Sequence, residues 1–200
     1  MRPATLLVFA KPPRIGLSKT RLAKGLGVSQ GRRIAAFTLA RTLRAARGSG
    51  CTVTVHVAPD RLVRDPQAQH VFGGMALAPQ GGGGLTERLS LALHCAPPGP
   101  VIFIGADAPD VTAGKLRAAT ALLRRKDAVF GPASDGGFWL FGLHKGPRMR
   151  PPFEGVRWSG PHAMEDVWSN LPRHSRIALL EQMTDIDEAS DWKAWTRRGR

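Results

Sequence analysis

Four short segments of the chain place charged residues beside glycine or apolar strands in ways that suit phosphate or metal chemistry. The first, residues 11–22, follows an apolar stretch and carries four cations and a glycine: Lys11, Arg14, Gly16, Lys19 and Arg21. Amides at a helix start bind anions, glycine permits close approach of the backbone, and lysine or arginine neutralises phosphate charge. The GxxxxGK[ST] spacing of a Walker A loop is absent. The segment predicts either a phosphate-binding loop or an exposed basic turn.

Asp107 comes soon after the apolar stretch 101–104, in the string GADAPD at 105–110. A carboxylate at the end of a strand is well placed to meet a ligand. Mg²⁺ and Mn²⁺ prefer carboxylate oxygens, commonly one or two of them together with substrate phosphates. We therefore expect Asp107 to bind Mg²⁺ or Mn²⁺. Asp110 also suits the turn before the next helix, where aspartate side chains often hydrogen-bond the backbone.

Two further aspartates each permit two interpretations. Asp135 lies in GPASDGGFWL (131–140), where Asp-Gly favours the turn of a β-hairpin. Alternatively, Asp135 lies beside an acceptor substrate, with Phe138 or Trp139 packed nearby. Asp187 lies in DIDEASD (185–191). It suits a second metal carboxylate, or else it begins the last helix, where acidic residues favour the positive end of the helix dipole.

The elements that must position these residues follow from the apolar pattern. Strands are predicted at 4–10, 51–58, 75–79, 101–105, 127–131 and 138–143, and the clearest helices at 29–47, 85–95, 113–125 and 161–171. Their alternation indicates an α/β fold with a mainly parallel central sheet covered by helices on both faces. Ligands of such sheets bind at the carboxyl ends of the strands. The glycine run 81–84 is expected to form a flexible loop over that site.

The composition fits one soluble domain. A chain of 200 residues is within the size of a single core, so one domain over residues 1–200 is expected. Cys51 and Cys95 lack CxxC or CxxH spacing, which argues against a disulfide framework and a zinc site. Lys-Pro-Pro-Arg follows the apolar stretch 4–10 where a signal peptide would have a cleavage site, and no apolar stretch reaches roughly 20 residues. We expect a cytoplasmic protein without a transmembrane segment.

The formal net charge of +14 creates a positive potential that attracts phosphates and nucleic acids. Several of the arginines lie along the predicted helix 29–47, where a solvated helix face explains them better than a dedicated nucleic-acid surface. No RRM, KH or zinc-finger signature is present. No specific nucleic-acid partner is therefore expected.

Five segments in order along the chain resemble the DUF2064 family, also described as a glycosyltransferase family associated with arsenosugar biosynthesis. The family lies within the GT-A-like, MobA-like nucleotide-diphospho-sugar transferase superfamily. The resemblance rests on KPPRxGxxKTRL at 11–22, a GxDxPxL-like string at 105–111, GPxxDGGxxLxGL at 131–143, FxGVxWS at 153–159 and DxDxxxD at 185–191. It implies a single-domain GT-A-like three-layer sandwich that transfers a sugar from a nucleotide-diphospho-sugar donor to a small-molecule acceptor, with Mg²⁺ or Mn²⁺.

The resemblance also assigns roles to residues. The loop 11–21 would contact the nucleotide and its phosphates, Asp107 would bind the metal, and Asp187 would lie opposite as a further metal ligand. Asp135 is the candidate base for the acceptor hydroxyl if the transfer inverts the sugar. Either stereochemical course is compatible with these residues.

The chain departs from the family pattern at positions that concern the acceptor. Gly84 stands where an acidic residue is more usual, Gly160 replaces a threonine, and Glu-Ala-Ser at 188–190 replaces Thr-Pro-Glu. Three other functions stay open: a nucleotidyltransferase that releases pyrophosphate, a family member that binds nucleotide without catalysis, and a noncatalytic polyanion-binding protein. Fold analogy does not choose among them.

Overall fold

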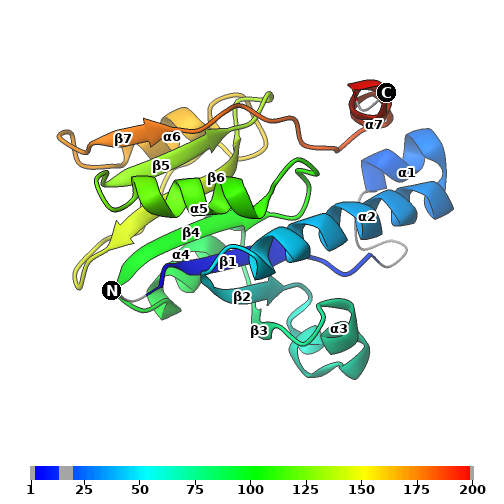
Figure 1. The fold of residues 1–200 in the computed structure, drawn as a ribbon, viewed down its shortest axis with the longest axis horizontal. Helices are drawn as coiled ribbons and strands as arrows, with labels where there is room; N and C mark the ends of the chain where they lie inside the picture. Colours follow the sequence, from blue (N-terminus) through cyan, green and yellow to red (C-terminus); the bar gives the residue numbers. More distant parts are fainter. Residues whose placement is uncertain (1–2, 14–19, 199–200) are drawn as a thin grey trace.

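Within residues 3–13 and 20–198, which the structure describes, seven strands form one sheet in the order β3-β2-β1-β4-β6-β5-β7. Figure 1 shows this sheet in the computed structural model. The strands are β1 (Thr5–Ala10), β2 (Thr52–Val57), β3 (Ala76–Pro79), β4 (Gly99–Gly105), β5 (Ala128–Pro132), β6 (Phe138–Lys145) and β7 (Ile177–Leu179). The predicted α/β class with a mainly parallel sheet is confirmed.

β6 is the strand that breaks the parallel pattern. It pairs antiparallel with both β4 and β5, whereas the remaining strand pairs are parallel. The connection from β5 to β6 is too short for the crossover that parallel neighbours require, so it closes as a hairpin. As a result β1, β4 and β5 run in the same direction. The segments that follow them, including Lys11, Asp107 and Asp135, leave the sheet at one edge.

Helices cover both faces of the sheet. They are α1 (Thr20–Leu26), α2 (Val28–Arg47), the 3₁₀ helix η1 (Asp60–Arg64), α3 (Pro66–Val71), α4 (Leu85–Cys95), α5 (Ala113–Leu122), α6 (Ala163–Ser169) and α7 (Ala189–Arg198). Apolar residues of α2 and α5 share one buried cluster with Leu6 and Val8 of β1, and those of α4 and α6 share another with Leu7. Because alternate residues of β1 enter opposite cores, its sequence is a continuous apolar run.

A third, smaller cluster lies beyond the sheet, where α1 and α7 meet one end of α2 (Figure 1). Leu22, Ile34 and Ile186 are fully or nearly fully buried there, with Trp192 and Trp195 packed against them. The indole Nε1 of Trp195 donates to Oδ1 of Asp110 at 2.9 Å. This contact ties α7 to the loop that follows β4. Asp110 does lie in the turn before α5, but its carboxylate accepts from a side chain of α7, whereas the turn interpretation predicted a hydrogen bond to the backbone.

The predicted strands and long helices are all present, with shifted ends. The predicted helix 113–125 ends at Leu122, and the predicted helix 161–171 is Ala163–Ser169. η1, α3 and β7, which have only five, six and three residues, were not predicted. α3 does carry a readable start, since Asp65 accepts from the Gln67 amide at 2.8 Å and proline occupies the first turn. No helix among the described residues combines the length and apolar character needed to cross a membrane.

Candidate active site

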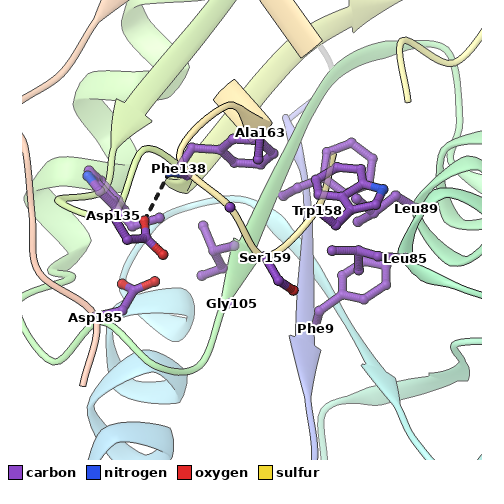
Figure 2. Close-up of a pocket in the computed structure, with 15 residues that line it drawn as sticks. Phe9, Leu85, Leu89, Gly105, Asp135, Phe138, Trp158, Ser159, Ala163 and Asp185 are labelled. Atoms are coloured by element: carbon purple, nitrogen blue, oxygen red, sulfur yellow. Dashed lines mark hydrogen bonds between the residues drawn. The ribbon is translucent and has the colours of Figure 1, made fainter. Parts of the chain in front are cut away.

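A pocket of about 210 Å³ opens where β1 and β4 end and β6 begins. Figure 2 shows that its two ends differ in character. The carboxylates of Asp135 and Asp185 face each other at one end, and the other end is walled by Phe9, Leu85, Leu89 and Trp158. Gly105, the last residue of β4, lies between them. The pocket therefore lies at the carboxyl ends of the parallel strands, where ligands of such sheets bind.

The hairpin turn between β5 and β6 presents Asp135. Its Oδ1 accepts from the Gly137 amide at 2.9 Å, and the Ala133 amide donates to the Gly137 carbonyl at 2.9 Å. The hairpin interpretation of this segment is confirmed. The same turn places an exposed carboxylate in the pocket, so the structural and functional interpretations of Asp135 are compatible. Its catalytic role stays a prediction.

Two neighbouring segments hold this turn in place. On one side the Ser134 amide donates to the Met183 carbonyl at 2.9 Å, and on the other the Met164 amide donates to the Gly136 carbonyl at 3.1 Å. A carboxylate on a turn fixed from both sides has little freedom to leave its position, which is the property that a positioned base requires.

Asp107 lies against the segment that carries the other two aspartates. The Ile186 amide donates to the Asp107 carbonyl at 3.0 Å. Of the residues flanking Ile186, Asp185 is half-buried and lines the pocket, whereas Asp187 is exposed. The chain therefore brings Asp107 and both carboxylates of the Asp-Ile-Asp string to adjoining segments.

The helix-start interpretation of Asp187 is confirmed for its backbone. Oδ2 of Asp191 accepts from the amides of Asp187 and Glu188 at 3.0 and 2.8 Å, which caps the start of α7. This leaves the proposed metal role of the Asp187 side chain as a prediction. Asp185 is a charged pocket residue that was not predicted from the sequence. The alternation of Asp185 and Asp187 about a buried isoleucine was the signal that could have found it.

The predicted phosphate loop leaves β1 at the same edge. Lys11, directly after β1, is exposed, and Arg21 in α1 is exposed as well. The other predicted loop residues, Arg14, Gly16 and Lys19, lie outside the described part of the chain.

The donor set at this edge suits a hard divalent cation that also binds substrate phosphate. No group of three or more His, Cys, Asp or Glu side chains with metal-binding geometry occurs within residues 3–13 and 20–198. Mg²⁺ commonly binds one or two carboxylates and completes its shell with water and phosphate oxygens. Asp107 and Asp187, on segments in direct backbone contact, fit that mode.

Hydrogen bonds from α4 fix the aromatic wall of the pocket. Nε1 of Trp158 donates to the Thr86 hydroxyl at 2.8 Å, and that hydroxyl donates to the Phe153 carbonyl at 3.0 Å. The next residue, Ser159, has φ of 61°, a left-handed conformation that costs a non-glycine residue energy. The segment bearing Trp158 and Ser159 is thus held in one conformation at the pocket.

An ion pair anchors the same segment to α6. Nη2 of Arg157 lies 2.7 Å from Oδ1 of Asp166, and Nε lies 2.9 Å from Oδ2. The hydrogen bonds from the Arg157 side chain and amide lower the pKa of Asp166 to about 2. The anchor is therefore fully charged throughout the neutral range.

The glycine run 81–84 leads into the first pocket residue of α4, Leu85. The Gly81 amide donates to Oδ1 of Asp60 at 3.2 Å, and Nε of Arg88 donates to the Gly83 carbonyl at 3.1 Å. The run lies next to the pocket, as predicted. Its predicted flexibility stays a prediction.

His56 supports the pocket from behind. Its ring stacks on Phe9 with 5.1 Å between centroids, and its Nδ1 lies 3.1 Å from the Pro79 carbonyl oxygen. Burial lowers the pKa of His56 from its usual 6.5, and the hydrogen bond to Pro79 opposes that shift only in part.

We expect the free energy of unfolding to fall as the pH drops below about 6.5. Because the folded-state pKa of His56 is depressed, the unfolded chain binds more protons in this range, and its protonation draws the equilibrium toward unfolding. Denaturant titrations between pH 7 and 5 measure how steeply the free energy of unfolding depends on pH. His56→Gln should make this dependence shallower, whereas His94→Gln, at an exposed position, should leave it unchanged. An equal slope in the wild type and His56→Gln would contradict the assignment.

The fold defines a structural class: it is the α/β fold shared by GT-A-like and nucleotidyltransferase proteins. A protein from Desulfovibrio desulfuricans G20, provisionally described as a nucleotide-diphospho-sugar transferase, is 24% identical and superposes with a TM-score of 0.92 over 100% of this chain and 89% of its own. The 4-diphosphocytidyl-2C-methyl-D-erythritol synthase of Anaerococcus prevotii DSM 20548 is 10% identical, with a TM-score of 0.66 over 100% and 99% of the two chains. Rv0371c of Mycobacterium tuberculosis H37Rv, solved in complex with manganese, is 14% identical, with a TM-score of 0.58 over 96% and 97%.

The chain belongs to the DUF2064 family, described as an uncharacterized protein conserved in bacteria, whose family model matches residues 39–160. The family expected from the five sequence segments is therefore confirmed. The comparison with curated proteins gave no match.

Proposed function

We propose that the protein is a metal-dependent glycosyltransferase that uses a nucleotide-diphospho-sugar donor and a small-molecule acceptor. The observation that carries the proposal is the pocket at the carboxyl ends of β1 and β4, where a positioned carboxylate faces an aromatic wall. Pockets with a few polar groups in an apolar lining supply both orientation and proton transfer. Family membership and the fold shared with nucleotide-diphospho-sugar transferases support it.

The donor occupies the edge beside this pocket in the proposal. The basic loop, with Lys11, Arg14, Gly16, Lys19 and Arg21, contacts the nucleotide phosphates, and Asp107 and Asp187 hold Mg²⁺ or Mn²⁺. The bound cation supplies neutralisation of the negative charge that develops on the leaving diphosphate. The manganese complex of Rv0371c, which has the same fold, supports a divalent cation here.

Each of these groups has a role in the proposed reaction. The acceptor hydroxyl oxygen bonds to the anomeric carbon of the sugar while the bond from that carbon to the diphosphate oxygen breaks, and the leaving nucleoside diphosphate takes the electron pair. In an inverting transfer the acceptor proton passes to the carboxylate of Asp135. Cations of the loop stabilise the leaving group more in the transition state than in the ground state, which is what accelerates a reaction.

The surroundings of the site complete the proposal. Cys51 and Cys95 are both free thiols, which agrees with a reducing, cytoplasmic location. The excess of lysine and arginine attracts small phosphorylated ligands, and no specific nucleic acid is bound.

A nucleotidyltransferase on this fold would use the same basic loop and Asp107, so those residues do not separate glycosyl transfer from nucleotidyl transfer.

The products of the reaction distinguish glycosyl transfer from nucleotidyl transfer. With Mn²⁺ and pooled nucleotide sugars, we expect release of a nucleoside diphosphate, and with pooled nucleoside triphosphates and phosphorylated acceptors we expect no pyrophosphate. Asp107→Asn should abolish the first activity, because one carboxylate charge is lost from the metal site. Glu154→Gln, at an exposed position outside the pocket lining, should retain it. Pyrophosphate appearing only in the second incubation, and lost in Asp107→Asn, would establish nucleotidyl transfer instead.

A further inference from the structure

Ser159 has a backbone conformation that serine rarely adopts. Its φ is 61°, and in the described part of the chain it is the one non-glycine residue with a positive φ, since the other positive values belong to glycines. Glycine adopts this conformation without steric cost, whereas a residue with a Cβ is strained by it. The shape of the turn therefore does not explain why the residue is a serine.

The two residues before Ser159 keep it in this strained conformation. The Trp158 indole donates to the Thr86 hydroxyl at 2.8 Å. The amide and the guanidinium of Arg157 both donate to the carboxylate of Asp166, at 2.7 to 2.9 Å. Backbone strain persists only where the surrounding structure fixes it, and strained residues are concentrated at ligand sites. The anchored segment thus holds Ser159 at the pocket at an energetic cost.

The Ser159 hydroxyl is open to the pocket. Ser159 is an exposed lining residue, and its side chain makes no hydrogen bond to any residue that the structure describes. The other neutral lining side chains with a polar atom are Trp139 and Trp158, whose indole N–H groups donate to the Glu181 carbonyl and to Thr86. Among the described lining residues, Ser159 is therefore the neutral side chain that remains for a hydrogen bond to a ligand.

A hydroxyl beside an aromatic face suits a sugar. A sugar ring has a face of C–H groups, which packs on an indole, and an edge of hydroxyls, which both donate to and accept from serine. Trp158 and Ser159 are consecutive, and in Figure 2 Ser159 lies between the two carboxylates and Phe9. Fixed polar groups in an otherwise apolar pocket orient the ligand and determine specificity.

We propose that Ser159 is a binding residue for a neutral sugar ring. Its hydroxyl hydrogen-bonds a hydroxyl of the sugar, while the C–H face of the ring packs on Trp158. The inference rests on the proposed function only in naming this sugar the acceptor. The sugar preference itself rests on the strain, the open hydroxyl and the neighbouring indole.

Ligand-observed NMR titrations of the full chain test the assignment without any donor. The probes are the methyl glycosides of glucose, galactose, mannose and ribose, and at least one should bind the wild type at millimolar concentration. Ser159→Ala should weaken that binding about three- to tenfold, the contribution of one hydrogen bond between neutral groups. Ser169→Ala, which changes an exposed serine of α6 outside the pocket lining, should not change it. Because the titrations need no turnover, their failure is distinct from a failure to release nucleoside diphosphate.

Ser159→Gly separates the role of the hydroxyl from that of the fold. Because glycine adopts a φ of 61° without strain, this variant should be at least as stable as Ser159→Ala in urea titrations and should weaken glycoside binding by the same factor. The proposal is overturned if no glycoside binds the wild type, or if both variants bind as tightly as the wild type. A loss in Ser159→Ala that Ser159→Gly restores would also overturn it, because backbone strain and not the hydroxyl would then govern binding.

Discussion

Asparagine in place of Asp135 is expected to lower kcat by about 10²- to 10⁴-fold, the range in which a positioned general base contributes. The fold should survive, because Oδ1 of asparagine can still accept the hydrogen bond that the Gly137 amide makes at 2.9 Å. The substitution removes the proton acceptor and keeps the shape of the turn. Steady-state kinetics together with thermal unfolding separate the two effects.

The matched control is Ser134→Ala, which changes an exposed neighbour in the same turn. Its backbone bond to Met183 does not involve the side chain, so turnover should stay within about twofold of the wild type, as for surface changes that touch nothing. A large loss of activity in Ser134→Ala would mean that the turn, and not the carboxylate, governs turnover.

Asp185 provides the sharpest rival to this assignment. It faces Asp135 in the pocket (Figure 2), so both carboxylates line the pocket in which the acceptor is proposed to bind. Asp185→Asn should cost less turnover than Asp135→Asn and should mainly raise KM. The reverse order, with Asp135→Asn nearly as active as the wild type, would transfer the role of base to Asp185.

The centre of the sheet was predictable from the sequence because its strands are buried on both faces. The run Thr5–Ala10 has apolar residues at successive positions since Leu6 and Leu7 enter different cores, and such runs are conspicuous. β7 was missed because three residues with a half-buried pattern carry almost no periodic signal.

The site was only partly predictable, because the pocket joins residues that are remote in the chain. Asp107, Asp135 and the basic loop were singled out from their place at strand ends, which is a local property, and Asp135 is the one of the three aspartates predicted as site residues that lines the pocket. The wall was not found: Phe9, Leu89 and Trp158 meet only in the folded chain, and each reads locally as a core residue. Asp185 was passed over for Asp187 because both flank Ile186 in the same way in the sequence. Only the folded chain shows that Asp185 lines the pocket and is half-buried, whereas Asp187 is exposed.

Alanine in place of Gly136 is expected to destabilise the fold by about 2–5 kcal/mol, the sum of two penalties. Gly136 has φ of 86°, and a left-handed conformation costs a residue with a Cβ roughly 1–2 kcal/mol. A Cβ at this position would also lie 2.2 Å from the Pro161 carbonyl oxygen. Backbone atoms cannot move aside cheaply, and overpacking of this kind typically costs about 1–3 kcal/mol.

The hydrogen bonds around Gly136 explain why the destabilisation caused by Gly136→Ala would also disturb the pocket. Its carbonyl accepts from the Met164 amide at 3.1 Å, which joins the Asp135 turn to the start of α6. A shift that relieves the contact with Pro161 must strain this bond or displace Asp135. We therefore expect Gly136→Ala to lose activity even in the fraction that remains folded.

Substitutions at two other glycines distinguish the cost of the left-handed backbone conformation from the cost of the contact with Pro161. Gly74 has φ of 72° with no atom within 4 Å of a built Cβ, so Gly74→Ala carries only the backbone cost, about 1–2 kcal/mol. Gly82 also has open space, and its φ lies outside the left-handed range, so Gly82→Ala should be close to neutral. Urea titrations of the three variants should give the lowest free energy of unfolding for Gly136→Ala, a clearly higher value for Gly74→Ala, and the highest value for Gly82→Ala. Equal losses for Gly136→Ala and Gly74→Ala would show that the Pro161 contact relaxes without cost, and that the turn beneath Asp135 is looser than its hydrogen bonds indicate.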